Sequence, residues 1–129
     1  MEFGNYGDNF KKLKDELNSF LYDKTITVDK KLSKIIFKME DIELLPEDLS
    51  HGELKKLGIY VWLKYFAIED ALVLMDEIEI ALHPDWQYEI ANELRKWSKN
   101  NQFILATHSY GLCDALTPGH IKELEPKLI

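Results

Sequence analysis

The strongest constraint on the fold is a pair of short apolar runs, at residues 71–75 and 103–106, with one helical pattern between them. Each run has the length of a β-strand, and polar side chains follow each one directly. Pro84 suits the first turn of a helix. Apolar residues then recur every three or four positions, at Trp86, Ile90, Leu94 and Trp97. Strand, helix and strand in this order predict a βαβ unit, whose buried parallel strands carry functional groups at their carboxyl ends.

The sequence on either side of this unit predicts further elements. In chain order we expect a helix at 8–22, a hairpin of strands 25–28 and 33–39 joined across 29–32, a polar connection at 41–49, and a helix from Ser50 to about Phe66. A short helix and a final strand near 120–124 are expected after the second apolar run. The fold class is therefore α/β. Residues 1–129 are expected to form a single domain, in which 1–48 hold the first helix and hairpin and 49–129 hold the parallel unit.

Composition limits the classes of protein. The chain of 129 residues is 46% apolar and 30% charged, which is typical of one compact globular domain. No apolar run approaches the roughly 20 residues that cross a bilayer, so we expect a cytoplasmic protein without membrane contact. Cys113 is the only cysteine, which excludes an internal disulfide and a zinc site built from cysteines. The net charge of −7, with Arg95 as the only arginine, argues against a nucleic-acid surface on this chain itself.

The first candidate site is the apolar run at 72–75 followed by Asp76 and Glu77, which is a Walker B arrangement. The first carboxylate of such a pair can hold Mg²⁺ through a water molecule. The second can orient or deprotonate a water that attacks a γ-phosphate in line. Taken alone, two solvated acids at the end of a strand explain the same pattern.

The second candidate site lies at residues 49–53. Ser50 and Glu53 have the spacing of a helix capping box, which explains the pattern without any ligand. The same geometry also suits an anion, because the Ser50 hydroxyl, the close backbone approach at Gly52 and the positive end of the following helix can together hold a γ-phosphate. The two interpretations are compatible.

The third candidate site is Thr107, His108 and Ser109, directly after the second apolar run. An imidazole at this place could donate to a phosphate oxygen or hold a water-activating carboxylate. A lone histidine at a strand end is usually an ordinary polar loop residue. Its position becomes informative because one helix fits between each pair of consecutive sites, as successive strands of a parallel sheet require.

In this order the three sites resemble a known family. LSHGE at 49–53, LVLMDE at 72–77 and ILATHS at 104–109 match the signature motif, the Walker B motif and the switch histidine of ABC-type ATPases. EIEIALHPDWQ at 77–87 is similar to the DEPE-x-x-LHP-x-WQ stretch of RecF-like and overcoming-lysogenization-defect-like ATPases of the AAA family, including those of bacterial anti-phage systems. The chain resembles the C-terminal half of such an ATPase, which implies a partial P-loop NTPase fold with parallel strands and flanking helices.

The resemblance also implies roles for the site residues. Asp76 would be the Mg²⁺-linked acid, acting through water, Glu77 the catalytic carboxylate, and His108 the switch. Ser50 and Gly52 would contact the γ-phosphate of ATP that the opposing subunit holds.

Residues 81–84 would form the D-loop, which in this family crosses the dimer interface beside the nucleotide. His83 in this loop is therefore expected to pack or to lie at an interface rather than to bind a metal.

The chain departs from the family pattern in several places. Ile78 stands where proline is usual, Ala81 where serine is frequent, and Tyr110 where proline often follows the switch. The larger departure is that no G-x-x-x-x-G-K-[ST] phosphate loop occurs in the 129 residues. ATP and Mg²⁺ are therefore expected only in a site completed by a Walker A-bearing half or a homologous subunit, in a homo- or hetero-oligomer. Nucleic-acid contact is expected only through other parts of such an assembly.

Two functions from different classes follow. The first is a truncated or split ATPase module that becomes active with the phosphate loop, which the intact Glu77 and His108 favour. The second is a non-catalytic module that keeps the fold for dimerisation or regulation, which the missing loop favours. A nuclease is disfavoured, because no further acidic cluster accompanies Asp76 and Glu77.

Overall fold

The computed structural model describes residues 6–28 and 34–124, with side chains from residue 11 onward. By its contacts the chain divides into two compact units, Met1–Gly58 and Ile59–Ile129. The division falls inside a helix, α2 (His51–Tyr65), rather than at residue 48. The single domain 1–129 stays a prediction.

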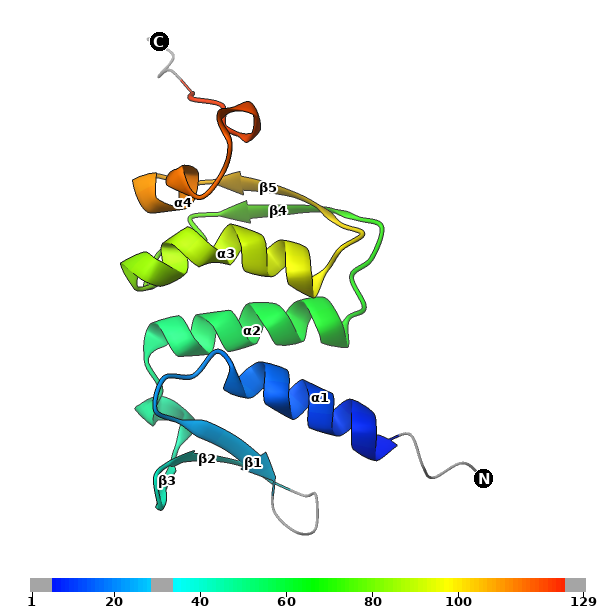
Figure 1. Cartoon of the computed structure of the whole chain (residues 1–129), viewed down its shortest axis with the longest axis vertical. Helices are drawn as coiled ribbons and strands as arrows, with labels where there is room; N and C mark the ends of the chain where they lie inside the picture. Colours follow the sequence, from blue (N-terminus) through cyan, green and yellow to red (C-terminus); the bar gives the residue numbers. More distant parts are fainter. Residues whose placement is uncertain (1–5, 29–33, 125–129) are drawn as a thin grey trace. The chain divides into compact units, whose positions relative to one another are not determined.

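The first unit contains one helix, a small antiparallel sheet and the start of α2. Its elements are α1 (Tyr6–Asn18), β1 (Thr25–Val28), β2 (Ile35–Met39), β3 (Ile42–Leu44) and the 3-10 turn η1 (Pro46–Asp48). The predicted hairpin is confirmed, because β1 pairs antiparallel with β2, from Thr25 opposite Lys38 to Val28 opposite Ile35 (Figure 1). Its expected turn at 29–32 lies outside the described residues.

The third strand of this sheet was not predicted. The sequence predicts a connection at 41–49, but β3 pairs antiparallel with β2 there, and Met39 lies opposite Ile42. The tight turn between them places Glu40 at φ 54°, a left-handed conformation that favours glycine. Because the turn has no glycine or asparagine and β3 has three residues, neither turn chemistry nor alternation marks it in the sequence.

Helix α1 ends at Asn18, four residues earlier than expected, because the Asn18 side chain pairs with the backbone of β1. Its Nδ2 donates to the Ile26 carbonyl at 3.3 Å, and its Oδ1 accepts from the Ile26 N–H. Asn18 thus occupies both backbone groups of a buried strand residue, much as a neighbouring strand would. Phe20, Ile26 and Leu49 are buried in this unit.

The second unit is the predicted βαβ arrangement. Besides the end of α2, it contains β4 (Leu72–Asp76), α3 (Pro84–Trp97), β5 (Gln102–Ala106), the short helix α4 (Tyr110–Asp114) and the 3-10 turn η2 (Pro118–His120). Strands β4 and β5 pair in parallel, from Leu72 opposite Gln102 to Asp76 opposite Ala106. In Figure 1 both arrows point toward the end of the unit where α4 begins.

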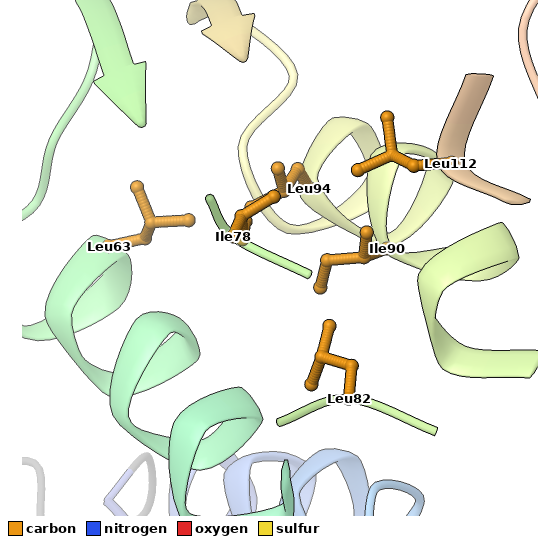
Figure 2. Close-up of a cluster of buried hydrophobic side chains, with 6 residues drawn as sticks. All are labelled: Leu63, Ile78, Leu82, Ile90, Leu94 and Leu112. Carbon is orange, nitrogen blue, oxygen red and sulfur yellow. The ribbon is translucent and has the colours of Figure 1, made fainter. Parts of the chain in front are cut away.

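A cluster of apolar side chains holds this unit together, and Figure 2 shows its six buried members. They are Leu63, Ile78, Leu82, Ile90, Leu94 and Leu112. The predicted stripe of α3 supplies two of them, while Trp86 and Trp97 are partly buried against the cluster. The turn after β4 supplies Ile78 and Leu82, so the backbone next to the candidate site is fixed to the core.

Two predictions for this unit need correction. No strand forms at 120–124, because Pro118 starts a 3-10 turn that includes His120, and residues 121–124 are exposed. The prediction of buried strands holds for one sheet face only. Val73 is buried, but Leu72, Leu74 and Ile104 on the other face are 57%, 68% and 51% exposed.

Candidate functional site

The carboxyl ends of β4 and β5 bring the acidic pair next to the histidine segment. Asp76 lies opposite Ala106 in the parallel register, and the Glu77 N–H donates to the Ala106 carbonyl at 2.9 Å. The residues after these points are Glu77 on one strand and Thr107 and His108 on the other. The structure therefore places two of the three sequence-predicted sites side by side, as parallel strands require.

The side chains of Asp76, Glu77 and His108 are exposed at this edge of the sheet. Asp76 presents a carboxylate, the type of ligand that Mg²⁺ prefers. Within residues 6–28 and 34–124, no group of three or more His, Cys, Asp or Glu side chains could hold a metal ion. Asp76 thus fits Mg²⁺ only as one ligand among waters and phosphate oxygens, which is the usual situation for Mg²⁺ at a nucleotide.

Glu77 has a backbone conformation that is unusual for a residue with a side chain. Its φ is 48°, in the left-handed region that favours glycine. The bond from its N–H to Ala106 and the buried side chain of the next residue, Ile78, hold this conformation in place. Residues held in such sparsely populated backbone conformations cluster at active sites, ligand clamps and switch regions. Ile78, which stands at the family's proline position, is tolerated here because it fills the core.

Glu79 is a site residue that the sequence analysis missed. Its side chain is only 7% exposed, and its Oε1 accepts a hydrogen bond from the His108 backbone N–H at 2.9 Å. Burial tends to raise the pKa of Glu79, but hydrogen bonds from the Thr107 side chain, its own backbone and the His108 backbone, with the charge of His108, lower that pKa overall. Glu79 stands at the last glutamate of DEPE in the quoted stretch at 77–87, so the motif gave a signal for this residue but not for its contact with His108.

Gln87 is a second missed residue. The Ser109 hydroxyl donates to Gln87 Oε1 at 2.6 Å, and Gln87 Nε2 donates to the Leu82 carbonyl at 3.1 Å. Ser109 Oγ also accepts from the Leu112 N–H at 3.1 Å, which caps α4. Gln87 belongs to the quoted LHP-x-WQ stretch, so its motif was visible in the sequence while its partner was not.

Ser50 and Gly52 lie in the first unit, at the start of α2, and the predicted capping box is confirmed there. Glu53 N–H donates to Ser50 Oγ at 3.2 Å, and Ser50 N–H donates to Glu53 Oε2 at 2.8 Å. The Ser50 residue is exposed and Gly52 is buried.

Glu53 has more partners than the capping box requires. Its carboxylate is 2% exposed, and Lys24 Nζ lies 3.0 Å from each of its oxygens. Burial tends to raise the pKa of Glu53, and the hydrogen bonds from Ser50 and Lys24 lower it overall. Glu53 therefore stabilises the first turn of α2. The sequence could not predict its contact with Lys24, because 29 positions separate the two residues.

His83 caps α3, since its Nδ1 accepts from the Asp85 N–H at 3.3 Å. The His83 side chain is exposed, so the expected packing or interface role stays a prediction. In the described part of the chain, no helix is both long and apolar enough to cross a bilayer.

Comparisons with curated proteins find partial matches, two of them to probable ATPases. The chain is 46% identical over 50 residues to the retron Ec83 probable ATPase of Escherichia coli, covering 39% of this chain and 9% of that protein. It is 45% identical over 51 residues to the retron Vc95 probable ATPase of Vibrio cholerae serotype O1 biovar El Tor, covering 40% and 10%. An uncharacterized protein of Dictyostelium discoideum is 32% identical over 88 residues, covering 63% and 12%. The chain thus spans 12% or less of the length of each of these relatives.

Solved structures show the same fold at low identity. The Smc head bound to the C-winged helix domain of ScpA has a TM-score of 0.57 and 17% identity, covering 84% of this chain and 38% of that one. A structure concerned with the ATP-driven dimerization and DNA-stimulated activation of SMC ATPases has a TM-score of 0.55 and 16% identity, covering 86% and 76%.

A family model matches most of the chain, over residues 8–114, and is described as AAA domain, putative AbiEii toxin, Type IV TA system. Such a family implies an ATPase-type module and the use of nucleotide and Mg²⁺ in general. The α/β fold and the resemblance deduced from the three motifs are confirmed. The chain belongs to this AAA-domain family and has the fold of a partial ABC-type ATPase.

Proposed function

We propose that this chain supplies the acidic and histidine side of an ABC-type ATP-hydrolysis site, and that a phosphate loop from outside the 129 residues completes the site. The loop could come from a longer polypeptide or from a partner subunit. One observation carries the proposal. The β4–β5 register and the 2.9 Å bond from Glu77 to Ala106 place the acidic pair beside His108 at the carboxyl edge of a parallel sheet.

The proposed roles follow from the chemistry at that edge. Asp76 would bind Mg²⁺ through a water, and the ion would neutralise charge on the β- and γ-phosphates. Glu77, held by its backbone, would orient and deprotonate the attacking water. His108 would donate from its exposed imidazole to a γ-phosphate oxygen, where charge develops in the transition state.

Ser50 and Gly52 are proposed to meet the γ-phosphate of ATP held by an opposing subunit. Support comes from α2, which has 15 residues and begins at an exposed, capped end. The positive end of such a helix attracts an anion. Lys24 neutralises the buried Glu53 carboxylate nearby, which reduces its repulsion of a phosphate.

In the completed ATPase, Ser50→Arg should reduce turnover to below about 1%, because bulk is placed where a γ-phosphate docks. The change also removes the cap of α2, which costs about 1 kcal/mol of stability. Ser50→Ala is the matched control, because it removes the cap without adding bulk, and it should keep turnover within about tenfold. ATP turnover and ATP-dependent association would be measured together. Normal turnover and association in Ser50→Arg would remove Ser50 from the proposed site.

A second candidate function is a non-catalytic module for dimerisation or regulation. The exposed apolar face of β4 and β5 favours it, and so does the lack of a phosphate loop in the 129 residues. Its oligomeric partners would be a second copy or a homologous subunit.

The biological role is proposed from the relatives. Similarity to two retron probable ATPases supports a place in anti-phage defence, in the cytoplasm.

A further inference from the structure

We infer that Glu79 and Gln87 act as positioning residues that fasten the switch loop, residues 107–109, to the turn that follows the acidic pair. The inference rests on the proposed function, in which His108 donates to a phosphate. It assigns a task to two side chains that the motif assignments leave without one.

The Glu79 contact fixes the middle of the switch loop. Its carboxylate oxygen Oε1 accepts from the His108 N–H at 2.9 Å. Because the net effect lowers the Glu79 pKa, the group is ionised near neutral pH, and bonds to an ionised acceptor are about twice as strong as neutral ones. The contact is made through the backbone of His108, so it leaves the imidazole exposed toward solvent.

The Gln87 contact fixes the end of the same loop. Its amide oxygen holds the Ser109 hydroxyl at 2.6 Å, and its amide nitrogen holds the Leu82 carbonyl at 3.1 Å. A single side chain of α3 therefore bridges the switch loop and the segment at 81–84, the expected D-loop. Between these two contacts, the Thr107 hydroxyl accepts from the Ser109 N–H at 2.9 Å, which links the two ends of the loop directly.

The turn that carries Glu79 is packed against the core. Ile78 and Leu82 flank the turn, and Figure 2 shows both directed into the apolar cluster with Ile90 and Leu94. Glu79 thus lies between two residues, Ile78 and Leu82, whose side chains are buried in the core. If the D-loop segment is displaced, the hydrogen bonds of Glu79 and Gln87 would move His108 with it. We infer that the switch histidine and the D-loop segment move as one body.

Hydrogen exchange on this chain, read by mass spectrometry over residues 103–112, tests the fastening without nucleotide. Glu79→Ala should speed exchange in this segment by about tenfold or more, because the His108 N–H loses its acceptor. Glu79→Gln keeps an acceptor oxygen and should stay within about threefold of the unchanged chain. Gln87→Ala, at a half-buried position, should speed exchange at Ser109 and remains informative if Glu79→Ala fails to fold.

The control variants are Glu89→Ala and Asn92→Ala, which change exposed residues of the same helix, α3, and should leave exchange unchanged. Unchanged exchange in Glu79→Ala and Gln87→Ala would overturn the inference. Equal acceleration in Glu79→Ala and Glu79→Gln would also overturn it, since the hydrogen bond would not be the cause.

Turnover in the completed ATPase gives the second readout. Misplacing a catalytic group by about 1 Å can cost about 100-fold in rate, so Glu79→Ala should lower kcat by about 10- to 100-fold. The KM for ATP should change by less than about threefold, because neither residue has a proposed contact with the nucleotide, and Glu79→Gln should restore most of kcat. An altered KM with unchanged kcat would overturn the positioning role. Because exchange is measured without ATP, it separates failure of this inference from failure of the proposed function.

Discussion

Replacing Glu77 with glutamine in the completed ATPase should lower kcat by about 10²- to 10⁴-fold, the usual contribution of a positioned general base. The amide has the shape of the carboxylate but cannot accept a proton. The position of the side chain should not change, because the backbone is held at φ 48° and by the bond from the Glu77 N–H to Ala106. ATP affinity should therefore stay within about threefold of the unchanged enzyme.

Phosphate release and ATP binding would be measured on the same preparation of Glu77→Gln. Glu89→Gln is the matched control, since it removes one negative charge from an exposed position of α3. It should turn over normally. A Glu77→Gln enzyme with normal turnover would move the base to another residue, and loss of binding together with turnover would indicate a structural role instead.

The second large effect concerns the oligomeric state of the chain in solution. Purified at low concentration, this chain should not behave as a monomer. Parallel sheets are normally covered on both faces, but Leu72, Leu74 and Ile104 leave one face of β4 and β5 apolar and largely exposed. In the described residues, β4 and β5 form a two-stranded sheet whose outer edges have no further strand. Such a face and such edges pair readily with other chains.

Light scattering on dilute protein measures this directly, against a chain mass of 15.1 kDa. The expected result is a dimer or larger particle. Leu74→Lys should shift the population toward the monomer, because it places a charge on the exposed sheet face. Leu124→Lys is the control, since Leu124 is exposed outside the sheet. A stable particle of 15.1 kDa from the unchanged chain would show that the sheet needs no further cover.

Local signals in the sequence accounted for the βαβ unit and the capping box. Pro84 and the apolar spacing after it define α3, and strand-length apolar runs define β4 and β5. The bonds of Ser50 and Glu53 join residues three positions apart, so sequence spacing was sufficient to predict them. Parallel pairing then dictated that the two strand ends, with their polar residues, would meet.

Features that depend on distant residues could not be predicted in this way. Glu79 and His108 are 29 positions apart, and Gln87 and Ser109 are 22 apart, so no local pattern joins them. The end of α1 was misplaced because Asn18 pairs with a strand that follows later in the chain. The strand expected at 120–124 does not form. The composition of this segment suits a strand, but no strand among the described residues pairs with it.

The central claim is that this chain holds the water-activating side of an ATPase site and needs a phosphate loop from elsewhere. The most direct test titrates Mg-ATP into the purified chain, alone and together with a polypeptide that carries the phosphate loop, and follows binding and phosphate release. We expect neither tight binding nor turnover by the chain alone, because Mg²⁺ and γ-phosphate contacts leave most of the triphosphate unheld. Steady turnover that depends on Glu77 should appear in the mixture. Micromolar affinity and steady turnover by the chain alone, abolished by Glu77→Gln, would contradict the account.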